Sequence, residues 1–161
     1  MGVKLLCMDV DGTLTDGKIY MSAQGELFKA FDVKDGYGIR NLLPKAGIVP
    51  VIITGRTSQI VTNRCKELGI QHIYQGCEDK AAKLEEVADQ FGLNADEDGI
   101  YREIAYVGDD LNDLEPMKLA GYVMCPADAC QKVAKAADYV SPIPGGSGAV
   151  RDAIEHLLEF G

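Results

Sequence analysis

This sequence of 161 residues lacks an apolar run of the roughly 18 residues that a membrane-spanning helix requires. It also lacks a secretory signal at its amino terminus, because the first apolar stretch already meets an acid at Asp9. Both absences argue against a membrane protein or a secreted protein. We therefore expect a cytoplasmic protein that has no membrane partner.

Cysteines and basic residues are also scarce. The five cysteines are odd in number and include no CxxC pair, which argues against a disulfide framework or a zinc site. The 16 lysines and arginines are outnumbered by 25 aspartates and glutamates, so the net charge is −9. Such an acidic protein should repel nucleic acid unless its few cations are clustered, and we expect no nucleic-acid partner.

What the sequence does contain is a regular alternation of apolar runs and helical patterns. The apolar runs predict strands at residues 3–10, 49–54, 72–74, 103–107 and 122–124. The helical patterns lie at residues 35–45, 58–68, 80–91, 112–119, 129–136 and 150–160. This order predicts an α/β fold, a three-layer, Rossmann-like parallel sheet with helices on both faces, in a single domain of residues 1–161.

Between the first strand and the first helix, residues 18–31 predict a small β-hairpin flap. Two β-rich runs flank a loop that contains Gly25, as in many hairpins. The hairpin carries several large apolar side chains, namely Ile19, Met21, Leu27, Phe28 and Phe31. A two-stranded hairpin with so much apolar surface needs a surface to pack against, either on another subunit or on its own domain.

Polar residues stand at the carboxyl ends of three predicted strands: Asp9, Thr54 and Asp109. In a parallel α/β sheet, ligands bind beyond those ends. Asp9 and Asp11, two residues apart on an extended segment, can converge on one point. Because neighbouring carboxylates repel each other, a divalent cation is a natural third member, and oxygen ligands favour Mg²⁺ over zinc.

These residues match what the cleavage of a phosphate monoester requires. Asp9 can attack phosphorus, and Asp11 can protonate the leaving oxygen and later activate water. The Thr54 hydroxyl and the Lys80 ammonium can stabilise the phosphoryl oxygens. Taken singly, each residue has an ordinary structural explanation, such as helix capping by Asp109 and Asp110. Their combination at neighbouring strand ends is what favours catalysis.

Four segments resemble the motifs of the haloacid dehalogenase-like superfamily: DVDGTLTDG at 9–17, IITGR at 52–56, Lys80 at a helix start, and GDDLND at 108–113. Longer segments are similar to the small phosphatases of 3-deoxy-2-ulosonate phosphates, the 3-deoxy-D-manno-octulosonate 8-phosphate phosphatase family. They are KAFDVKDGYGIR at 29–40, Arg64-Cys65, YQGCEDK at 74–80 and GGSGAVRD at 145–152. One departure is Ser147, where many relatives have arginine.

The resemblance implies a core without a large cap domain and an Mg²⁺ ion bound by the side chains of Asp9 and Asp109 and the main-chain carbonyl of Asp11. It implies hydrolysis of the eight-carbon sugar acid phosphate through an aspartyl-phosphate, in lipopolysaccharide synthesis. It also implies a homotetramer in which hairpin 18–31 lies between subunits. The substrate-binding residues would be Asp32, Lys34, Asp35, Gly36, Arg40, Gly55, Arg56, Arg64 and Lys80.

Two alternatives stay open. The substrate could be a nine-carbon, sialic- or KDN-type ulosonate 9-phosphate, although Arg56 favours the eight-carbon acid. Residues 126–139 also resemble part of a module of CMP-sialic acid synthetases, so the chain could be a non-catalytic assembly module that partners such a synthetase. The presence of Asp9, Asp11, Thr54, Lys80 and Asp109 favours an enzyme.

Overall fold

The structure, a computed structural model, describes residues 2–160, and its centre is a six-stranded parallel sheet with the strand order β5-β4-β1-β6-β7-β8. The strands are β1 (Leu5–Met8), β4 (Val49–Ile53), β5 (His72–Tyr74), β6 (Tyr101–Val107), β7 (Ala120–Cys125) and β8 (Tyr139–Val140). The helices are α1 (Val33–Tyr37), α2 (Leu43–Lys45), α3 (Gln59–Glu67), α4 (Lys80–Gln90), α5 (Leu114–Leu119), α6 (Gln131–Ala136) and α7 (Ala149–Phe160).

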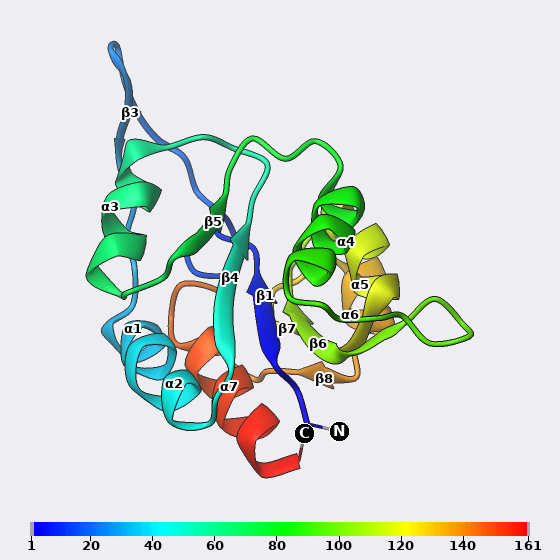
Figure 1. The fold of residues 1–161 in the computed structure, drawn as a ribbon. Coiled ribbons are helices and arrows are strands. Elements are labelled where there is room, and N and C mark those ends of the chain that lie inside the picture. The colour runs from blue at the N-terminus through cyan, green and yellow to red at the C-terminus, as the bar shows by residue number, and fades with distance from the viewer. Residues whose placement is uncertain (1, 161) are drawn as a thin grey trace.

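Helices cover both faces of this sheet. In Figure 1, α1, α2, α3 and α7 lie on one side and α4, α5 and α6 on the other. The central strand β1 shows why, since its side chains alternate between two buried clusters. Leu6 and Met8 pack into the cluster under the first group of helices, and Leu5 and Cys7 into the other cluster. The predicted three-layer α/β fold is confirmed.

A separate antiparallel hairpin, β2 (Tyr20–Ser22) and β3 (Gly25–Phe28), projects from the body of the molecule (Figure 1). Tyr20 and Phe28 stack across it with their ring centroids 4.4 Å apart. Its other apolar side chains are exposed, Met21 by 63% and Leu27 by 59%. Within residues 2–160 this hairpin is the largest insertion into the α/β core, so the structure has no large cap domain there.

The first helical segment differs from its prediction at both its start and its middle. It begins after Asp32, whose carboxylate accepts a hydrogen bond from the Lys34 N–H at 2.7 Å, rather than at residue 35. After α1, a π-helical turn (Gly38–Leu42) leads into α2. The Leu43 N–H bonds to the carbonyl of Gly38, five residues back, and Pro44 has no N–H with which to restore the α-helical pattern.

Two shorter elements also differ from what the sequence predicts. The helix expected over 112–119 is a 3-10 turn (Leu111–Asp113) followed by α5. The two-residue strand β8 was not predicted, because so short a run carries no periodicity of its own and forms only by pairing with β7. Within the part of the chain that is described, no helix has the combination of length and apolar character needed to cross a membrane.

Candidate active site

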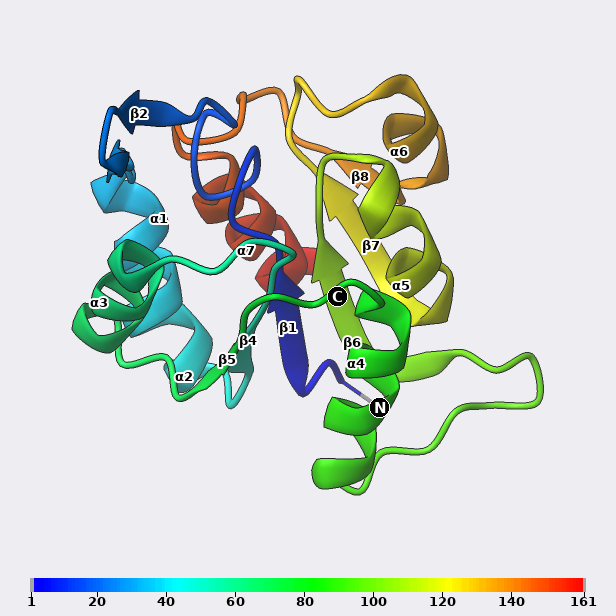
Figure 2. The same ribbon diagram turned by 90° about the horizontal axis from the view of Figure 1, so that it is seen from above.

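The carboxyl ends of β1, β4 and β6 meet at one edge of the sheet (Figure 2) and bring three predicted residues together. Asp9 follows β1, Thr54 follows β4 and Asp109 lies two residues beyond β6. They line an open cleft of about 220 Å³. The other residues that line this cleft are Asp11, Gly17, Gly55, Arg56, Asp110 and Asn112.

Lys80, the first residue of α4, lies beside the cleft and forms two buried ion pairs. Its Nζ is 2.9 Å from Asp9 Oδ1 and 2.8 Å from Asp113 Oδ1. Burial would lower the pKa of Lys80, but the two carboxylates outweigh it and hold that pKa above its usual value. Lys80 is therefore a fixed positive charge next to Asp9.

Asp113, which the sequence analysis did not single out, is fully buried and contacts Lys80. Its Oδ1 also accepts a hydrogen bond from the Tyr106 hydroxyl at 2.7 Å. Its Oδ2 accepts the backbone N–H groups of Asp109 at 2.9 Å and Asp110 at 3.2 Å. The signal that could have found it is an acid one helical turn after Asp109, within the GDDLND segment.

Asp109 and Asp110 have separate tasks, although they are adjacent. The Asp110 carboxylate caps the following 3-10 turn by accepting the Leu111 N–H at 2.8 Å. The Asp109 carboxylate instead faces the cleft, and the Thr13 hydroxyl donates to its Oδ1 at 2.9 Å. Helix capping therefore explains Asp110 but not Asp109.

The site concentrates negative charge where it is poorly solvated. Carboxylate oxygens of Asp9, Asp109 and Asp113 all lie within 4.8 Å of one another. Burial, together with neighbouring Asp9, raises the pKa of Asp109 to about 8. Burial and Asp113 also raise the pKa of Asp9, against the lowering effect of Lys80. Because every oxygen of Asp113 already accepts hydrogen bonds, Asp9 and Asp109 are the carboxylates that remain for a cation.

Close backbone packing holds the loop that follows Asp9. Gly12 has a positive φ of 91°, and a Cβ added there would lie 1.9 Å from Asp109 Oδ2. Gly145, near the other end of the chain, packs closely against the same loop. A Cβ added to Gly145 would lie 2.0 Å from the Gly12 carbonyl oxygen. The Gly146 N–H also bonds to the Thr13 carbonyl at 3.3 Å. Residues 145–146 thus support the loop that follows Asp9 in the same chain.

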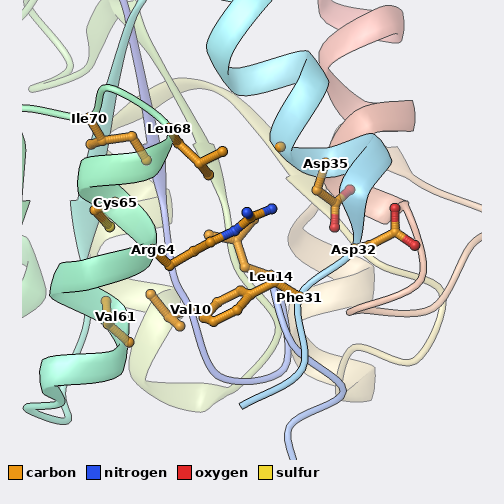
Figure 3. A pocket seen from close by; sticks show the side chains of 11 residues that line it. Val10, Leu14, Phe31, Asp32, Asp35, Val61, Arg64, Cys65, Leu68 and Ile70 are labelled. Atoms are coloured by element: carbon orange, nitrogen blue, oxygen red, sulfur yellow. The ribbon is translucent and has the colours of Figure 1, made fainter. Parts of the chain in front are cut away.

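The predicted substrate-binding residues fall into two groups. Gly55 and Arg56 line the cleft of Asp9, together with Asp11 and Thr54. Asp32, Asp35, Gly36 and Arg64 instead line a narrow crevice between α1 and α3 (Figure 3). Three predicted residues line neither space. Lys80 is buried beside the cleft, whereas Lys34 and Arg40 are solvent-exposed, and Arg40 donates to the Glu67 carbonyl at 2.9 Å. One chain does not bring the two groups into a single pocket.

In the crevice, the Arg64 side chain points toward Asp35 from the opposite wall (Figure 3). Asp35 Oδ1 accepts the Arg151 N–H at 2.8 Å. Asp35 Oδ2 and Arg64 Nε have no hydrogen-bond partner within the described range 2–160. Burial raises the pKa of Asp35 to about 6, because the hydrogen bond from Arg151 only partly compensates for the loss of water around the charge.

Comparison with known proteins agrees with this geometry. Residues 73–154 match the model of the haloacid dehalogenase-like hydrolase family. A 3-deoxy-D-manno-octulosonate 8-phosphate phosphatase from Escherichia coli K12 is 44% identical over 156 residues, which are 97% of this chain and 79% of that protein. The corresponding protein of Yersinia pestis is 42% identical, over 97% of this chain and 80% of the relative.

Solved structures of such phosphatases superpose on nearly the whole chain. The enzyme of Moraxella catarrhalis, in complex with a magnesium ion, a phosphate ion and a KDO molecule, has a TM-score of 0.89 and 41% identity, covering 98% of this chain and 86% of its own. The cobalt-bound enzyme of Haemophilus influenzae has a TM-score of 0.90 and 35% identity, covering 98% and 88%. The chain belongs to the 3-deoxy-D-manno-octulosonate 8-phosphate phosphatase family of the haloacid dehalogenase-like hydrolases.

Proposed function

We propose that this protein is a magnesium-dependent phosphatase that hydrolyses 3-deoxy-D-manno-octulosonate 8-phosphate to the free sugar acid and phosphate. The observation that carries the proposal is the pairing of Asp9 with the Lys80 ammonium at 2.9 Å, beside Asp109, at the carboxyl ends of β1 and β6. The relatives that match nearly all of this chain carry that activity in their names. The five free thiols fit a reducing compartment, so we place the protein in the cytoplasm.

The residues present fit an Mg²⁺ ion. Asp9 and Asp109 would hold it with their carboxylates, and Asp11 with its main-chain carbonyl. An all-oxygen donor set suits Mg²⁺. Burial and neighbouring carboxylates raise the pKa values of Asp9 and Asp109, so the single Lys80 ammonium does not fully compensate the negative charge of this cluster. When bound, the ion would neutralise charge on these carboxylates and on the phosphoryl oxygens.

The reaction would proceed in two displacements at phosphorus. A carboxylate oxygen of Asp9 attacks, a bond to the sugar oxygen breaks, and Asp11 gives that oxygen a proton. Asp11 then takes a proton from water, which attacks the aspartyl-phosphate and releases phosphate and the Asp9 carboxylate. Lys80 orients Asp9, and the Thr54 hydroxyl donates to a phosphoryl oxygen.

The test of substrate is phosphate release, with Mg²⁺, from eight- and nine-carbon ulosonate phosphates and from ordinary hexose phosphates. We expect both ulosonate phosphates to react faster than the hexose phosphates, because Arg56 lines the cleft and arginine suits a carboxylate. We expect the eight-carbon one to react fastest, because the relatives that match nearly all of this chain are named for it. If the nine-carbon ulosonate phosphate reacts faster, it replaces the eight-carbon one as the proposed substrate. Equal, slow rates on all of them would contradict the specific substrate, and no phosphate release from any of them would favour the non-catalytic assembly module.

The test of mechanism is the variant Asp9→Asn, which keeps the shape of the side chain but removes the nucleophile. We expect kcat to fall by at least about 10³-fold. Phosphate release at the wild-type rate from this variant would contradict an aspartyl-phosphate mechanism.

We further propose a homotetramer in which hairpin 18–31 packs between subunits. Its exposed Met21 and Leu27 supply the apolar surface, and a two-stranded hairpin is not stable alone. Light scattering should give about four times the monomer mass for the wild type, since the proposal is a tetramer. The double variant Met21→Ser, Leu27→Ser should lower that mass, and a monomeric wild type at micromolar concentration would contradict the proposal.

The separation of Arg64 from the cleft suggests that the two groups of substrate-binding residues meet only across subunits. Inactive Asp9→Asn and Arg64→Met subunits, mixed and reassembled, should then regain activity, because some interfaces would combine an intact cleft with an intact Arg64. If Arg64 serves its own chain's cleft, the mixture would be no more active than its components.

A further inference from the structure

A lysine at the base of the hairpin contacts the residue assigned as the acid. Lys29 directly follows β3, and its Nζ bonds to Asp11 Oδ1 and lies 3.1 Å from Glu26 Oε2. The Lys29 side chain is only 2% exposed, whereas those of Asp11 and Glu26 are exposed by 18% and 17%. A buried cation is thus enclosed by two carboxylates at the rim of the cleft.

Glu26, the second partner, is itself held by the segment that follows β4. The Ser58 hydroxyl, at the start of α3, donates to Glu26 Oε1 at 2.6 Å. The Ser58 N–H in turn bonds to Gln75 Oε1 at 2.8 Å. Arg56 adds a longer ion pair to Glu26 Oε2 at 3.6 Å. The Lys29 ammonium is therefore fixed between the hairpin and the loop that follows β4.

We propose that Lys29 is a positioning residue for Asp11, resting on the proposed function of this site. A proton donor is effective only within hydrogen-bond reach of the leaving oxygen, and an aspartate on a loop can otherwise turn away. Lys29 occupies Oδ1 of Asp11, which leaves Oδ2 to carry the proton to the leaving oxygen. The hairpin that carries Lys29 thereby becomes part of the catalytic apparatus.

The competing explanation is that Lys29 only fastens the hairpin to the domain. The two explanations differ in how the loss depends on the leaving group. A sugar alkoxide needs a proton to leave, whereas p-nitrophenolate leaves without one. A misplaced Asp11 slows the first far more than the second, but general loosening of the hairpin slows both alike.

The experiment uses the full-length variant Lys29→Met, which removes the charge and keeps much of the length. Leaving-group release is followed in a single turnover, so that hydrolysis of the aspartyl-phosphate does not enter. For the best alkyl phosphate of the substrate panel we expect a loss of about 10- to 100-fold, with KM within about threefold of the wild type. For p-nitrophenyl phosphate the loss should be less than about threefold, since that leaving group requires no acid.

Two further variants complete the test. Lys29→Arg retains a cation and should recover a large part of the alkyl phosphate rate. Lys132→Met, at an exposed position of α6, should behave as wild type with both substrates. The ratio of the two substrates' rates within one preparation does not depend on the fraction of folded protein, so poor folding of Lys29→Met cannot imitate the result.

Equal losses with both substrates, or none with either, would overturn the proposal for Lys29. So would a Lys29→Arg variant as slow with the alkyl phosphate as Lys29→Met. Failure of the proposed function looks different, because there Asp9→Asn would remain active. An inactive Asp9→Asn together with an unaffected Lys29→Met would reject only the role of Lys29.

Discussion

Beneath the cleft, Asp113 is the acceptor for groups that come from three different parts of the chain. It receives hydrogen bonds from the Lys80 ammonium, the Tyr106 hydroxyl and two successive backbone N–H groups. It thereby fixes Lys80 next to Asp9 and orients the backbone that carries Asp109. Its contribution to the site is to hold two other charged residues in place.

Replacing Asp113 by asparagine should therefore destabilise the protein strongly. The change leaves Lys80 with one buried counter-charge and turns an amide toward several donors, so we expect a loss of about 3–5 kcal/mol in the free energy of unfolding. Urea denaturation measures it. Asp110→Asn is the matched control, because asparagine still caps a helix, and its stability should stay within about 0.5 kcal/mol of wild type. Similar small effects in both variants would contradict the role of Asp113.

Gly12 illustrates a different constraint, in which the absence of a side chain makes room for a functional one. In Gly12→Ala, the added Cβ would collide with Asp109 Oδ2, at 1.9 Å. We expect kcat to fall by at least about 100-fold, since displacement of about 1 Å at a reacting group has that effect.

Gly99→Ala is the control for this substitution. Gly99 also has a positive φ, 81°, but an added Cβ would meet no atom within 4 Å. It should cost about 1–3 kcal/mol of stability through backbone strain, with kcat unchanged. If both variants lose activity equally, strain rather than the collision with Asp109 is responsible.

At the scale of elements, the contact of α1 with α7 depends on a buried carboxyl. Asp35, on α1, accepts the backbone N–H of Arg151 near the start of α7. Close packing accompanies this bond, since a Cβ added to Gly38 would lie 3.0 Å from the Ile154 side chain. The hydrogen bond does not compensate fully for burial of the charge, and the pKa of Asp35 rises from 3.8 to about 6.

This shift predicts how stability depends on pH. Between pH 3.8 and 6 the folded state holds a proton on Asp35 that the unfolded state has lost, so stability falls as pH rises through this window. The full effect, reached above the window, is about 3 kcal/mol. Asp35→Asn does not titrate, so its stability relative to wild type should increase by about 2.4 kcal/mol between pH 4 and pH 7, which is most of the full effect. An equal difference at both pH values in urea denaturation would contradict the assignment.

At the scale of the whole molecule, an acidic protein has a site for an anionic substrate. The net charge is −9, and the cleft adds buried carboxylates to that excess. Lys80 and Arg56 supply positive charge locally, but Lys80 is already paired with Asp9 and Asp113. A divalent cation would therefore serve both the stability of the fold and the binding of phosphate.

Mg²⁺ should accordingly stabilise the folded protein. At a free concentration of 100 times Kd, the expected gain is about 2.7 kcal/mol, measured as a rise in the thermal midpoint and reversed by EDTA. Because the pKa of Asp109 is about 8, Mg²⁺ must displace a proton at lower pH, so the gain should be larger at pH 8.5 than at pH 6.5. Asp109→Asn should abolish most of the shift. A shift of equal size in that variant would place the ion elsewhere.

The fold class and the residues at the strand ends were predictable from the sequence because they depend on local patterns. The buried run at β1, the glycines that end helices and the alternation of strand and helix are each visible within about a dozen residues. Asp9 and Thr54 follow such runs directly, and Asp109 lies two residues beyond one. Parallel strands then bring their ends to one edge, which is a general property of the fold.

Long-range packing decided the rest. Lys29 reaches Asp11 across 18 positions and Lys80 reaches Asp113 across 33. No local pattern in the sequence records such contacts, because they depend on how loops from different strands pack together. The same holds for Gly145 against Gly12, and for Arg64, which lies in a separate crevice from Arg56. The sequence by itself determined which residues can perform the chemistry, and the tertiary structure alone decided which side chains hold them in place.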